Sequence, residues 1–320
     1  MNIIITGGAG FIGSHVVDRY LKAGHSVAVI DNLSTGSVKN LNPRAKFYKL
    51  DLKNHSQLDK IFKREKPEIV NHHAAQAEVR RSVDDPIFDA QTNIIGGLNI
   101  LHCCVKYKVK KIIYANTGGA LYGAAPSAKL PVREDYPIKP ESPYGMSKYT
   151  FENYLELYSK LFVLKYTSLR YANIYGPRQN PQGEAGVVAI FIGLMLANQS
   201  PKIFGDGRQT RDYLFVADVA QANVLALTRA RNQKINLGTA QQTSVNQIYK
   251  MIAAEIGFTG KPIYSPAIKG EIRRASQNWD LAKKKLGWSP KVDLATGIKK
   301  TLKKKHSRPD LDNPFFALVN

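Results

Sequence analysis

Short apolar segments alternate with longer amphipathic segments along the first half of the chain. Segments rich in β-branched residues predict buried strands at 2–6, 26–30, 46–50, 69–72, 111–115 and 164–170. Helical patterns lie between them, the longest at about 85–107. Alternation of this kind predicts an α/β fold with a doubly wound parallel sheet, because each helix carries the chain back to start the next parallel strand.

The second half is less regular and richer in Pro and Gly. Helical patterns lie near 185–197, 217–228, 244–256 and 293–303, and 309–314 has the composition of an irregular tail. We expect a nucleotide-binding domain at 1–172, joined by a returning strand near 234–238. Residues 173–320 mainly form a smaller, interleaved lobe over the carboxyl edge of the sheet, where ligands bind in such folds.

A glycine-rich turn joins the first predicted strand to the first helix. Its glycines, Gly7, Gly10 and Gly13, have the spacing G-x-x-G-x-x-G. Gly7 permits the tight turn, Gly10 lets the backbone approach a diphosphate, and Gly13 allows the helix to pack on the strand. The helix N-terminus presents free N–H groups to the anion. The segment therefore predicts a Rossmann fold that binds a dinucleotide.

An acidic residue ends the second strand. Asp31 lies 18 residues after Gly13, close to the ~20 expected of the acid that holds the adenosine ribose. A carboxylate there accepts the ribose hydroxyls and repels a 2′-phosphate. Residues 32–36 contain no arginine to offset that repulsion, so we predict NAD as the cofactor rather than NADP.

Tyr144 and Lys148 are four residues apart and share one face of a predicted helix. Ser142 is a candidate N-cap and Pro143 suits the first helical position. A free tyrosine titrates near ~10, and a fixed lysine charge beside it would favour the phenolate near neutral pH. The pair is a candidate general base, although the same spacing occurs by chance in many helices.

Composition fits a water-soluble enzyme: 43% of the 320 residues are hydrophobic, enough for a large core. The N-terminal apolar run has no basic leader, and no stretch of ~18 apolar residues could span a bilayer, so we expect a cytoplasmic protein with no membrane contact. Cys103 and Cys104 are adjacent and are interpreted as small buried hydrophobic residues. His72 and His73 would face opposite sides of a strand, so we predict no metal site.

The net charge is +21, from 46 basic and 25 acidic residues. One interpretation is a basic surface that attracts nucleic acid or strongly anionic ligands. The other is a solvated lysine-rich surface, which the scattered lysines and the runs at 283–285 and 299–305 favour. Nucleic-acid binding is therefore not expected, but the charge leaves it open.

Four motifs together resemble the extended short-chain dehydrogenase/reductases, and more narrowly the UDP-glucose 4-epimerases. They are TGGAGFIGSH at 6–15, DNLSTG at 31–36, SPY at 142–144 with Lys148, and GDG at 205–207 before QTRDY at 209–213. The similarity extends from residue 1 to about 303, and the motifs occur in the family's order.

The resemblance implies epimerisation at carbon 4 of a UDP-hexose. Tyr144 would remove the proton of the carbon-4 hydroxyl while hydride passes to NAD, and a transient 4-keto sugar would turn and receive the hydride on its other face. Other nucleotide-sugar enzymes of the family stay open: a uronate epimerase, a decarboxylase, a 4-reductase or a dehydratase. Dehydration is disfavoured, because Gly119 and Ala120 stand where dehydratases carry acids. A non-catalytic, nucleic-acid-binding family member is the alternative of a different class.

The resemblance also implies the site residues. Those expected to bind NAD are Gly7, Gly10, Phe11, Ile12, Gly13, Asp31, Asn32, Ser34, Thr35, Gly36, Asp51, Leu52, Ala74, Ala75, Asn93, Tyr144, Lys148 and Tyr171. Those expected to bind the UDP-sugar are Thr117, Asn173, Gly186, Val187, Phe204, Arg211 and Glu271.

One position departs from the family pattern. Gly118 stands where a catalytic Ser or Thr is usual, so we predict that Thr117 supplies the hydroxyl and acts with Tyr144 and Lys148. Ala275 stands where some members have a tyrosine that narrows the sugar pocket, so room for an N-acetyl group and use of UDP-N-acetylglucosamine are predicted. The family also implies a homodimer, packed through the helix after residue 84 and the Tyr144 helix.

Overall fold

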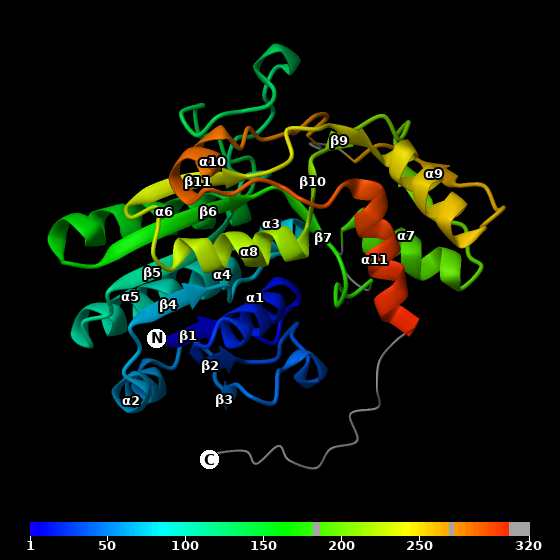
Figure 1. Cartoon of the computed structure of the whole chain (residues 1–320). Coiled ribbons are helices and arrows are strands. Elements are labelled where there is room, and N and C mark those ends of the chain that lie inside the picture. The colour runs from blue at the N-terminus through cyan, green and yellow to red at the C-terminus, as the bar shows by residue number, and fades with distance from the viewer. Residues whose placement is uncertain (182–185, 269–271, 307–320) are drawn as a thin grey trace.

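Seven parallel strands form the central sheet of the computed structural model, which describes residues 1–181, 186–268 and 272–306 (Figure 1). The strands are β1 (Asn2–Thr6), β2 (Ser26–Asp31), β3 (Lys46–Lys49), β4 (Ile69–His72), β5 (Lys111–Thr117), β6 (Lys165–Tyr171) and β11 (Gln233–Leu237). Their order across the sheet is β11-β6-β5-β4-β1-β2-β3, and every neighbouring pair is parallel. The predicted doubly wound α/β fold is confirmed, and the strand bounds agree with the expected ones to within two residues.

The order of the strands reverses between β1 and β4. From β1 the chain proceeds to β2 and β3 on one side, and then returns to place β4, β5 and β6 on the other. Helices that leave the two neighbouring strands β1 and β4 therefore diverge to opposite faces, and a crevice opens at their carboxyl ends. This crevice is where the fold places a ligand.

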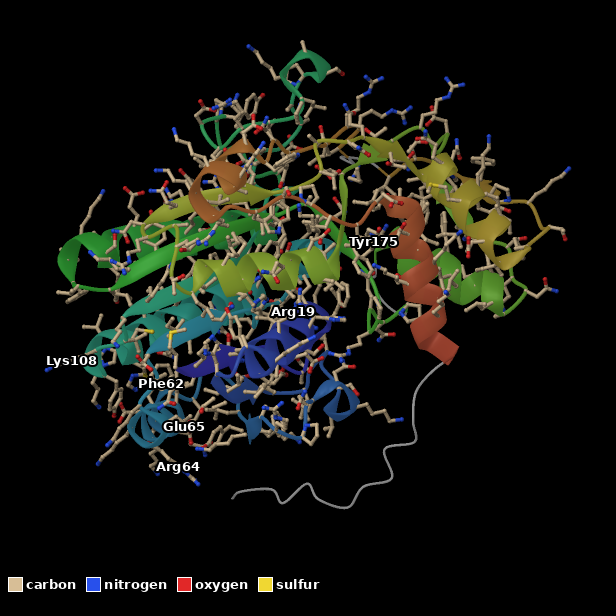
Figure 2. The ribbon with its side chains drawn as sticks, viewed as in Figure 1. Arg19, Phe62, Arg64, Glu65, Lys108 and Tyr175 are labelled. Carbon is tan, nitrogen blue, oxygen red and sulfur yellow. The ribbon has the colours of Figure 1, made fainter. Side chains whose placement is uncertain are left out.

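Helices cover both faces of the sheet (Figure 1). The helices are α1 (Phe11–Lys22), α2 (His55–Glu65), α5 (Gly96–Lys106), α6 (Pro143–Leu161), α8 (Val216–Ala226) and α10 (Asp280–Leu286). Ile3 and Ile5 of β1 pack with α1, α8 and α10, whereas Ile4 packs with α2, α5 and α6. Because alternate residues of a strand face opposite sides, burial on both faces requires the continuous apolar runs seen in the sequence. Phe62 of α2 (Figure 2) is fully buried on the second face.

The helical pattern predicted at 85–107 forms several consecutive segments. They are α4 (Pro86–Ala90), a π-helical turn η2 (Gln91–Ile95) and α5, and α3 (Val79–Asp84) precedes them. Gly97 of α5 lies directly against α6, where a Cβ would be 2.5 Å from the ring of Phe151. α6 begins as predicted, with Pro143 in its first turn and the Ser142 hydroxyl accepting a hydrogen bond from Gly145 N at 3.1 Å. Single 3₁₀ turns lie at η1 (Val38–Asn40) and η3 (Ser127–Lys129).

The remaining elements form a smaller lobe beside the carboxyl edge of the sheet (Figure 1). Its strands pair as β7 (Asn173–Tyr175) with β10 (Tyr213–Phe215), β8 (Lys202–Phe204) with β13 (Ile263–Ser265), and β9 (Thr210–Arg211) with β12 (Thr243–Ser244). Its helices, α7 (Val187–Leu196), α9 (Val245–Ile256) and α11 (Leu294–His306), share one apolar core with them. Tyr175 (Figure 2) packs on Gly297 of α11. The division at residue 172 stays a prediction, since β11 returns from this half to pair with β6.

None of the helices in the described ranges is long and apolar enough to cross a membrane.

Candidate active site

The glycine turn between β1 and α1 has a conformation that excludes larger side chains. Gly7 has φ +71°, and a Cβ on it would lie 2.5 Å from Ala74 N. A Cβ on Gly13 would overlap the carbonyl oxygen of Gly7. These two contacts are with backbone atoms, which cannot move aside cheaply, so glycine is required at both positions. The turn leaves the N-terminus of α1 open toward the crevice, as diphosphate binding requires.

Asp31 ends β2 and is held by backbone donors. Its carboxylate accepts hydrogen bonds from Ala9 N at 3.0 Å and from Leu33 N at 2.8 Å. Burial raises the pKa of Asp31, and these two bonds oppose that rise. A carboxylate has about four acceptor positions, so positions remain for a pair of ribose hydroxyls. The geometry fits the predicted NAD, because the acid is fixed before any ligand arrives.

A cavity of ≈ 320 Å³ lies along the carboxyl ends of β1, β2, β4 and β5. Sixteen predicted cofactor residues line it: Gly7, Gly10, Phe11, Ile12, Gly13, Asp31, Asn32, Ser34, Thr35, Asp51, Leu52, Ala74, Ala75, Tyr144, Lys148 and Tyr171. Gly36 and Asn93 do not line the cavity. Gly36 packs against Ala9, and the buried Asn93 amide binds Gln76 and Ser147.

The sequence prediction missed seven lining residues: Ile30, Leu50, His73, Ala77, Thr92, Ala115 and Asn116. Most of them lie in or just after the last residues of parallel strands, so the rule that ligands bind at the carboxyl edge could have found them. Burial lowers the pKa of His73 to about 3, which keeps its imidazole neutral beside the ring of Tyr171. Thr92 lies in the π-helical turn and carries no comparable sequence signal. No group of three or more His, Cys, Asp or Glu in the described ranges could hold a metal ion.

Tyr144 and Lys148 of α6 lie together with Thr117, the last residue of β5. The Thr117 hydroxyl lies close enough to the Tyr144 phenol to lower the pKa of that phenol, and it accepts a hydrogen bond from Ala120 N at 3.2 Å. Lys148 is buried, and its Nζ donates to Ala115 O at 2.7 Å. Tyr144 and Lys148 line the cavity, and Thr117 directly follows the lining residues Ala115 and Asn116 on β5, so a proton could leave a substrate hydroxyl at this point.

The charges at this point differ from the sequence expectation. Burial raises the pKa of Tyr144 to about 12, with the Thr117 hydrogen bond opposing the rise and the charge of Asp89 adding to it. Burial also lowers the pKa of Lys148 to about 7, against a smaller rise caused by Asp89. Burial thus opposes the predicted lowering of the phenol pKa by Lys148, because both groups lose solvation, and the role of the pair stays a prediction.

A residue distant in the sequence excludes a side chain at position 118. A Cβ on Gly118 would overlap the amide group of Gln277. Gln277 is buried and its backbone is fixed: Asp212 Oδ2 accepts from Gln277 N at 3.1 Å. The usual hydroxyl position is therefore closed by the Gln277 amide, while Thr117 reaches Tyr144 from the preceding residue.

Two predicted substrate residues of the smaller lobe lie close to the nucleotide-binding half, and one of them, Asn173, lies beside the catalytic segment. Asn173 Oδ1 lies 3.8 Å from the position that a Cβ would take on Gly119. Phe204 is partly exposed, and the guanidinium of Arg80 from α3 lies 5.9 Å from its ring centre, so the two halves of the chain meet there.

Other substrate candidates lie at the ends of lobe elements. Gly186 is the N-cap of α7 and precedes Val187. Arg211 Nη1 donates to Thr210 O at 2.9 Å. Glu271 lies outside the described residues.

The parallel sheet, the glycine turn and the Tyr144–Lys148 pair define a dinucleotide-dependent enzyme of the extended short-chain dehydrogenase/reductase type. Residues 3–238 match the NAD-dependent epimerase/dehydratase family, and the chain belongs to that family.

Proteins named as UDP-glucose 4-epimerases are similar to this chain over nearly its whole length. A putative UDP-glucose 4-epimerase of Methanocaldococcus jannaschii is 48% identical, over 94% of this chain and 97% of the relative. The crystal structure of UDP-glucose 4-epimerase with UDP-glucose from Thermotoga maritima is 49% identical, with a TM-score of 0.94, over 96% of this chain and 99% of that chain. The Thermus thermophilus UDP-glucose 4-epimerase complex with NAD is 40% identical, with a TM-score of 0.90, over 95% and 98% of the two chains.

Proposed function

We propose that this protein is an NAD-dependent isomerase that inverts carbon 4 of a UDP-hexose and interconverts UDP-glucose and UDP-galactose. The observation that carries the proposal is one cavity that Asp31, Tyr144 and Lys148 all line, with Thr117 beside the Tyr144 phenol. The similarity to UDP-glucose 4-epimerases along the whole chain supports the same reaction.

Tyr144 is the proton carrier in this reaction. When bound, NAD supplies a hydride acceptor at carbon 4 and a positive charge beside the phenol. Tyr144 takes the proton of the carbon-4 hydroxyl on oxidation and returns it on reduction, so the cycle consumes no proton. The Thr117 hydroxyl hydrogen-bonds the reacting oxygen, and Lys148, fixed on Ala115 O, keeps the phenol in place.

The other predicted residues bind the two nucleotides. Asp31 holds the adenosine ribose, and the turn from Gly7 to Gly13 holds the NAD diphosphate. Asn173 and Arg211 bind the diphosphate of the UDP-sugar, and Arg211 offers a planar donor fork suited to phosphate. Gly186, Val187 and Phe204 border the uridine. A firm grip on the nucleotide with few contacts to the hexose would let the 4-keto sugar turn over.

The direct test is conversion of UDP-galactose to UDP-glucose by the purified protein without added NAD. The reaction is stopped and the protein removed, and the UDP-glucose formed is then measured with UDP-glucose dehydrogenase, to which NAD is added only in this second step. Acid extraction of the purified protein measures retained NAD. We expect activity with retained NAD, and its loss in Tyr144→Phe. Tyr149→Phe, on the same helix but outside the cavity lining, is the matched control and should retain activity. Net consumption of NAD(P)H or release of carbon dioxide would instead favour a reductase or a decarboxylase.

Ala275 supports a wider sugar specificity. It is half-buried, and Ala275 N donates to Thr210 O at 3.2 Å, which fixes this small residue next to the Arg211 segment. We therefore propose that UDP-N-acetylglucosamine is also a substrate. Ala275→Tyr should lower kcat/KM for the acetylated sugar selectively, and a parent enzyme that converts only the unacetylated pair would contradict this proposal.

Exposed apolar side chains support a homodimer. Val83 on α3 is 60% exposed, Ile87 on α4 is 70% exposed and Leu157 on α6 is 45% exposed, and these helices pack together. An apolar surface of this kind marks a protein interface. Ile87→Glu should give a monomer in sedimentation equilibrium. Val163→Glu should not, because Val163, although exposed, lies in the loop after α6 and outside the surface that α3, α4 and α6 form. A monomeric parent would contradict the proposal.

A further inference from the structure

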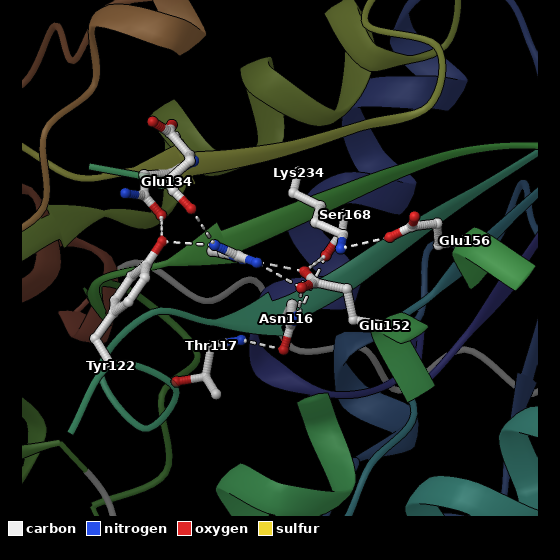
Figure 3. A network of polar contacts seen from close by, with 10 residues as sticks. Asn116, Thr117, Tyr122, Glu134, Glu152, Glu156, Ser168 and Lys234 are labelled. Atoms are coloured by element: carbon white, nitrogen blue, oxygen red, sulfur yellow. Dashed lines mark hydrogen bonds and ion pairs between the residues drawn. The ribbon is translucent and has the colours of Figure 1, made fainter. Parts of the chain in front are cut away.

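A buried ion pair joins Arg170 and Glu152, and Figure 3 shows Glu152 beside Asn116, the residue before Thr117. Arg170 of β6 donates from Nη2 to Glu152 Oε1 at 2.5 Å and from Nε to Glu152 Oε2 at 3.1 Å. Glu152 is 0% exposed and Arg170 is 2% exposed. A pair buried this deeply contributes little net stability, because desolvation of both charges offsets their attraction. Its contacts point to a different role.

The spacing along α6 connects Glu152 to the catalytic pair. Tyr144, Lys148 and Glu152 follow one another at intervals of four residues and so lie on one face of the helix. Lys148 Nζ binds Ala115 O, and one turn later Glu152 Oε2 accepts a hydrogen bond from Asn116 Nδ2 at 2.8 Å. Successive turns of α6 are thereby fastened to successive residues of β5. The next residue of β5 is Thr117.

Glu152 also decides which way the Asn116 amide faces. A carboxylate only accepts hydrogen bonds, so the NH₂ group of Asn116 must point toward Glu152, where it also lies 3.3 Å from Ser168 Oγ. The amide oxygen is then left to accept from Thr117 N at 2.8 Å. If the amide were reversed, two donors would face each other at Thr117 N. The charge of Glu152 therefore fixes the backbone of the residue whose hydroxyl meets Tyr144.

The same ion pair anchors the chain on the other side of Thr117. Arg170 Nη1 donates to the Tyr122 hydroxyl at 2.8 Å, and that hydroxyl donates to Asn236 Oδ1 of β11 at 2.6 Å (Figure 3). Residues 117–121, which include Gly118 and Gly119, thus lie between two anchors joined to one ion pair. Two glycines make this segment flexible by itself, so anchors at both ends limit where the Thr117 hydroxyl can be.

We propose that Asn116, Glu152, Arg170 and Tyr122 are positioning residues that hold the Thr117 hydroxyl against the Tyr144 phenol. The proposal rests on the proposed epimerase reaction, in which that hydroxyl contacts the reacting oxygen. Loss of an anchor lowers kcat, because the hydroxyl loses its fixed place in the transition state. It leaves KM for the UDP-sugar unchanged, because no anchor is among the residues proposed to bind the UDP-sugar.

The experiment is a double-mutant cycle on kcat with the NAD-loaded enzyme. Asn116→Ala removes the acceptor of Thr117 N while keeping the ion pair, and Tyr122→Phe removes only the second anchor. Each should lower kcat by ~10- to 100-fold, with KM for the UDP-sugar within about twofold of the parent. Tyr122 does not line the cofactor cavity, so Tyr122→Phe should also retain NAD as the parent does, whereas Asn116→Ala, at a lining position, is assayed with saturating NAD. In a Thr117→Ala background each should have almost no further effect, because there is no hydroxyl left to position.

Phe62→Leu is the control for lost stability, since Phe62 is fully buried on α2 and does not line the cavity. It should lower the unfolding temperature without changing kcat. Effects of Asn116→Ala and Tyr122→Phe that multiply with that of Thr117→Ala would overturn the inference. If Asn116→Ala fails to fold, the test uses Tyr122→Phe alone, by comparing its effect on kcat in the parent and in the Thr117→Ala background. A parent enzyme without epimerase activity would contradict the proposed function instead.

Discussion

Replacement of Lys148 by methionine should make the protein more stable at neutral pH while removing its activity. The lysine is buried, its Nζ has Ala115 O as an acceptor, and it lies 4.5 Å from the ring centre of Tyr114. Methionine has a similar length and no charge, so it fills the same space without the cost of desolvating an ammonium group.

The magnitude follows from the pKa of Lys148, which burial lowers from 10.5 to about 7. Between these values the unfolded chain binds a proton that the folded chain does not bind, so the stability of the parent rises with pH across this window. Each pKa unit corresponds to about 1.4 kcal/mol, so below pH 7 the buried lysine lowers the free energy of unfolding by at most about 5 kcal/mol. Relaxation around the charge and loss of the Ala115 hydrogen bond reduce the expected gain to about 1–3 kcal/mol.

The assay is urea unfolding of parent and Lys148→Met from pH 6 to 9.5, with and without saturating NAD, because a ligand of the folded state adds its own stability. The free energy of unfolding of Lys148→Met should exceed that of the parent most at pH 6–7, and this difference should decrease as the pH rises toward 10.5.

Lys111→Met is the matched control. Lys111 is also buried and its pKa is also lowered to about 7, but its Nζ binds the carbonyls of Ala226 and Arg229. The free energy of unfolding of Lys111→Met, relative to the parent, should follow the same pH trend as that of Lys148→Met. The increase should be smaller, or the variant should be less stable than the parent, and activity should be retained. If the difference in free energy of unfolding between parent and Lys148→Met does not change with pH, the reasoning is refuted.

Three further outcomes are expected. Asp31→Ser removes the charge that repels a 2′-phosphate, so the ratio of NADP to NAD affinity should rise at least ~10-fold in binding titrations; an unchanged ratio would contradict the role of the acid. Gly118→Ser should lower the free energy of unfolding by about 1–3 kcal/mol through overlap with Gln277, and Gln277→Ala should restore much of that loss, whereas additive losses would argue against the overlap. The phenol of Tyr144, followed as the absorbance difference between parent and Tyr144→Phe, should titrate near about 12 without NAD and at lower pH with it, because the added positive charge favours phenolate; an unshifted titration would be inconsistent with the proposed base.

The strands and the glycine turn could be predicted from the sequence because local patterns determine them. A strand buried on both faces must be apolar at consecutive positions, and residues 69–72 were bounded correctly for that reason. The cofactor cavity followed from the same patterns, since Gly7, Gly13 and Asp31 lie at strand ends whose positions the topology sets.

Features that depend on distant residues could not be predicted. The closure of the Gly118 position by Gln277 joins segments about 160 residues apart, and no local pattern marks it. The pKa of Tyr144 depends on burial, which the spacing of Tyr144 and Lys148 does not show. The sequence shows Glu152 only as a charged residue one helical turn after Lys148. Its partner Arg170 lies on another strand, so the ion pair appears only when α6 packs on β5 and β6.

The return of β11 to the sheet has a consequence for the autonomy of the two halves of the chain. β11 covers the outer hydrogen-bonding edge of β6 from Thr167 to Tyr171, although it is supplied by residues 233–237. A chain that ended at residue 172 would leave that edge bare, with a row of unpaired backbone groups open to another copy. The nucleotide-binding half should therefore aggregate when produced alone, and a recombination or fusion point within 173–232 should be tolerated only where β11 is retained.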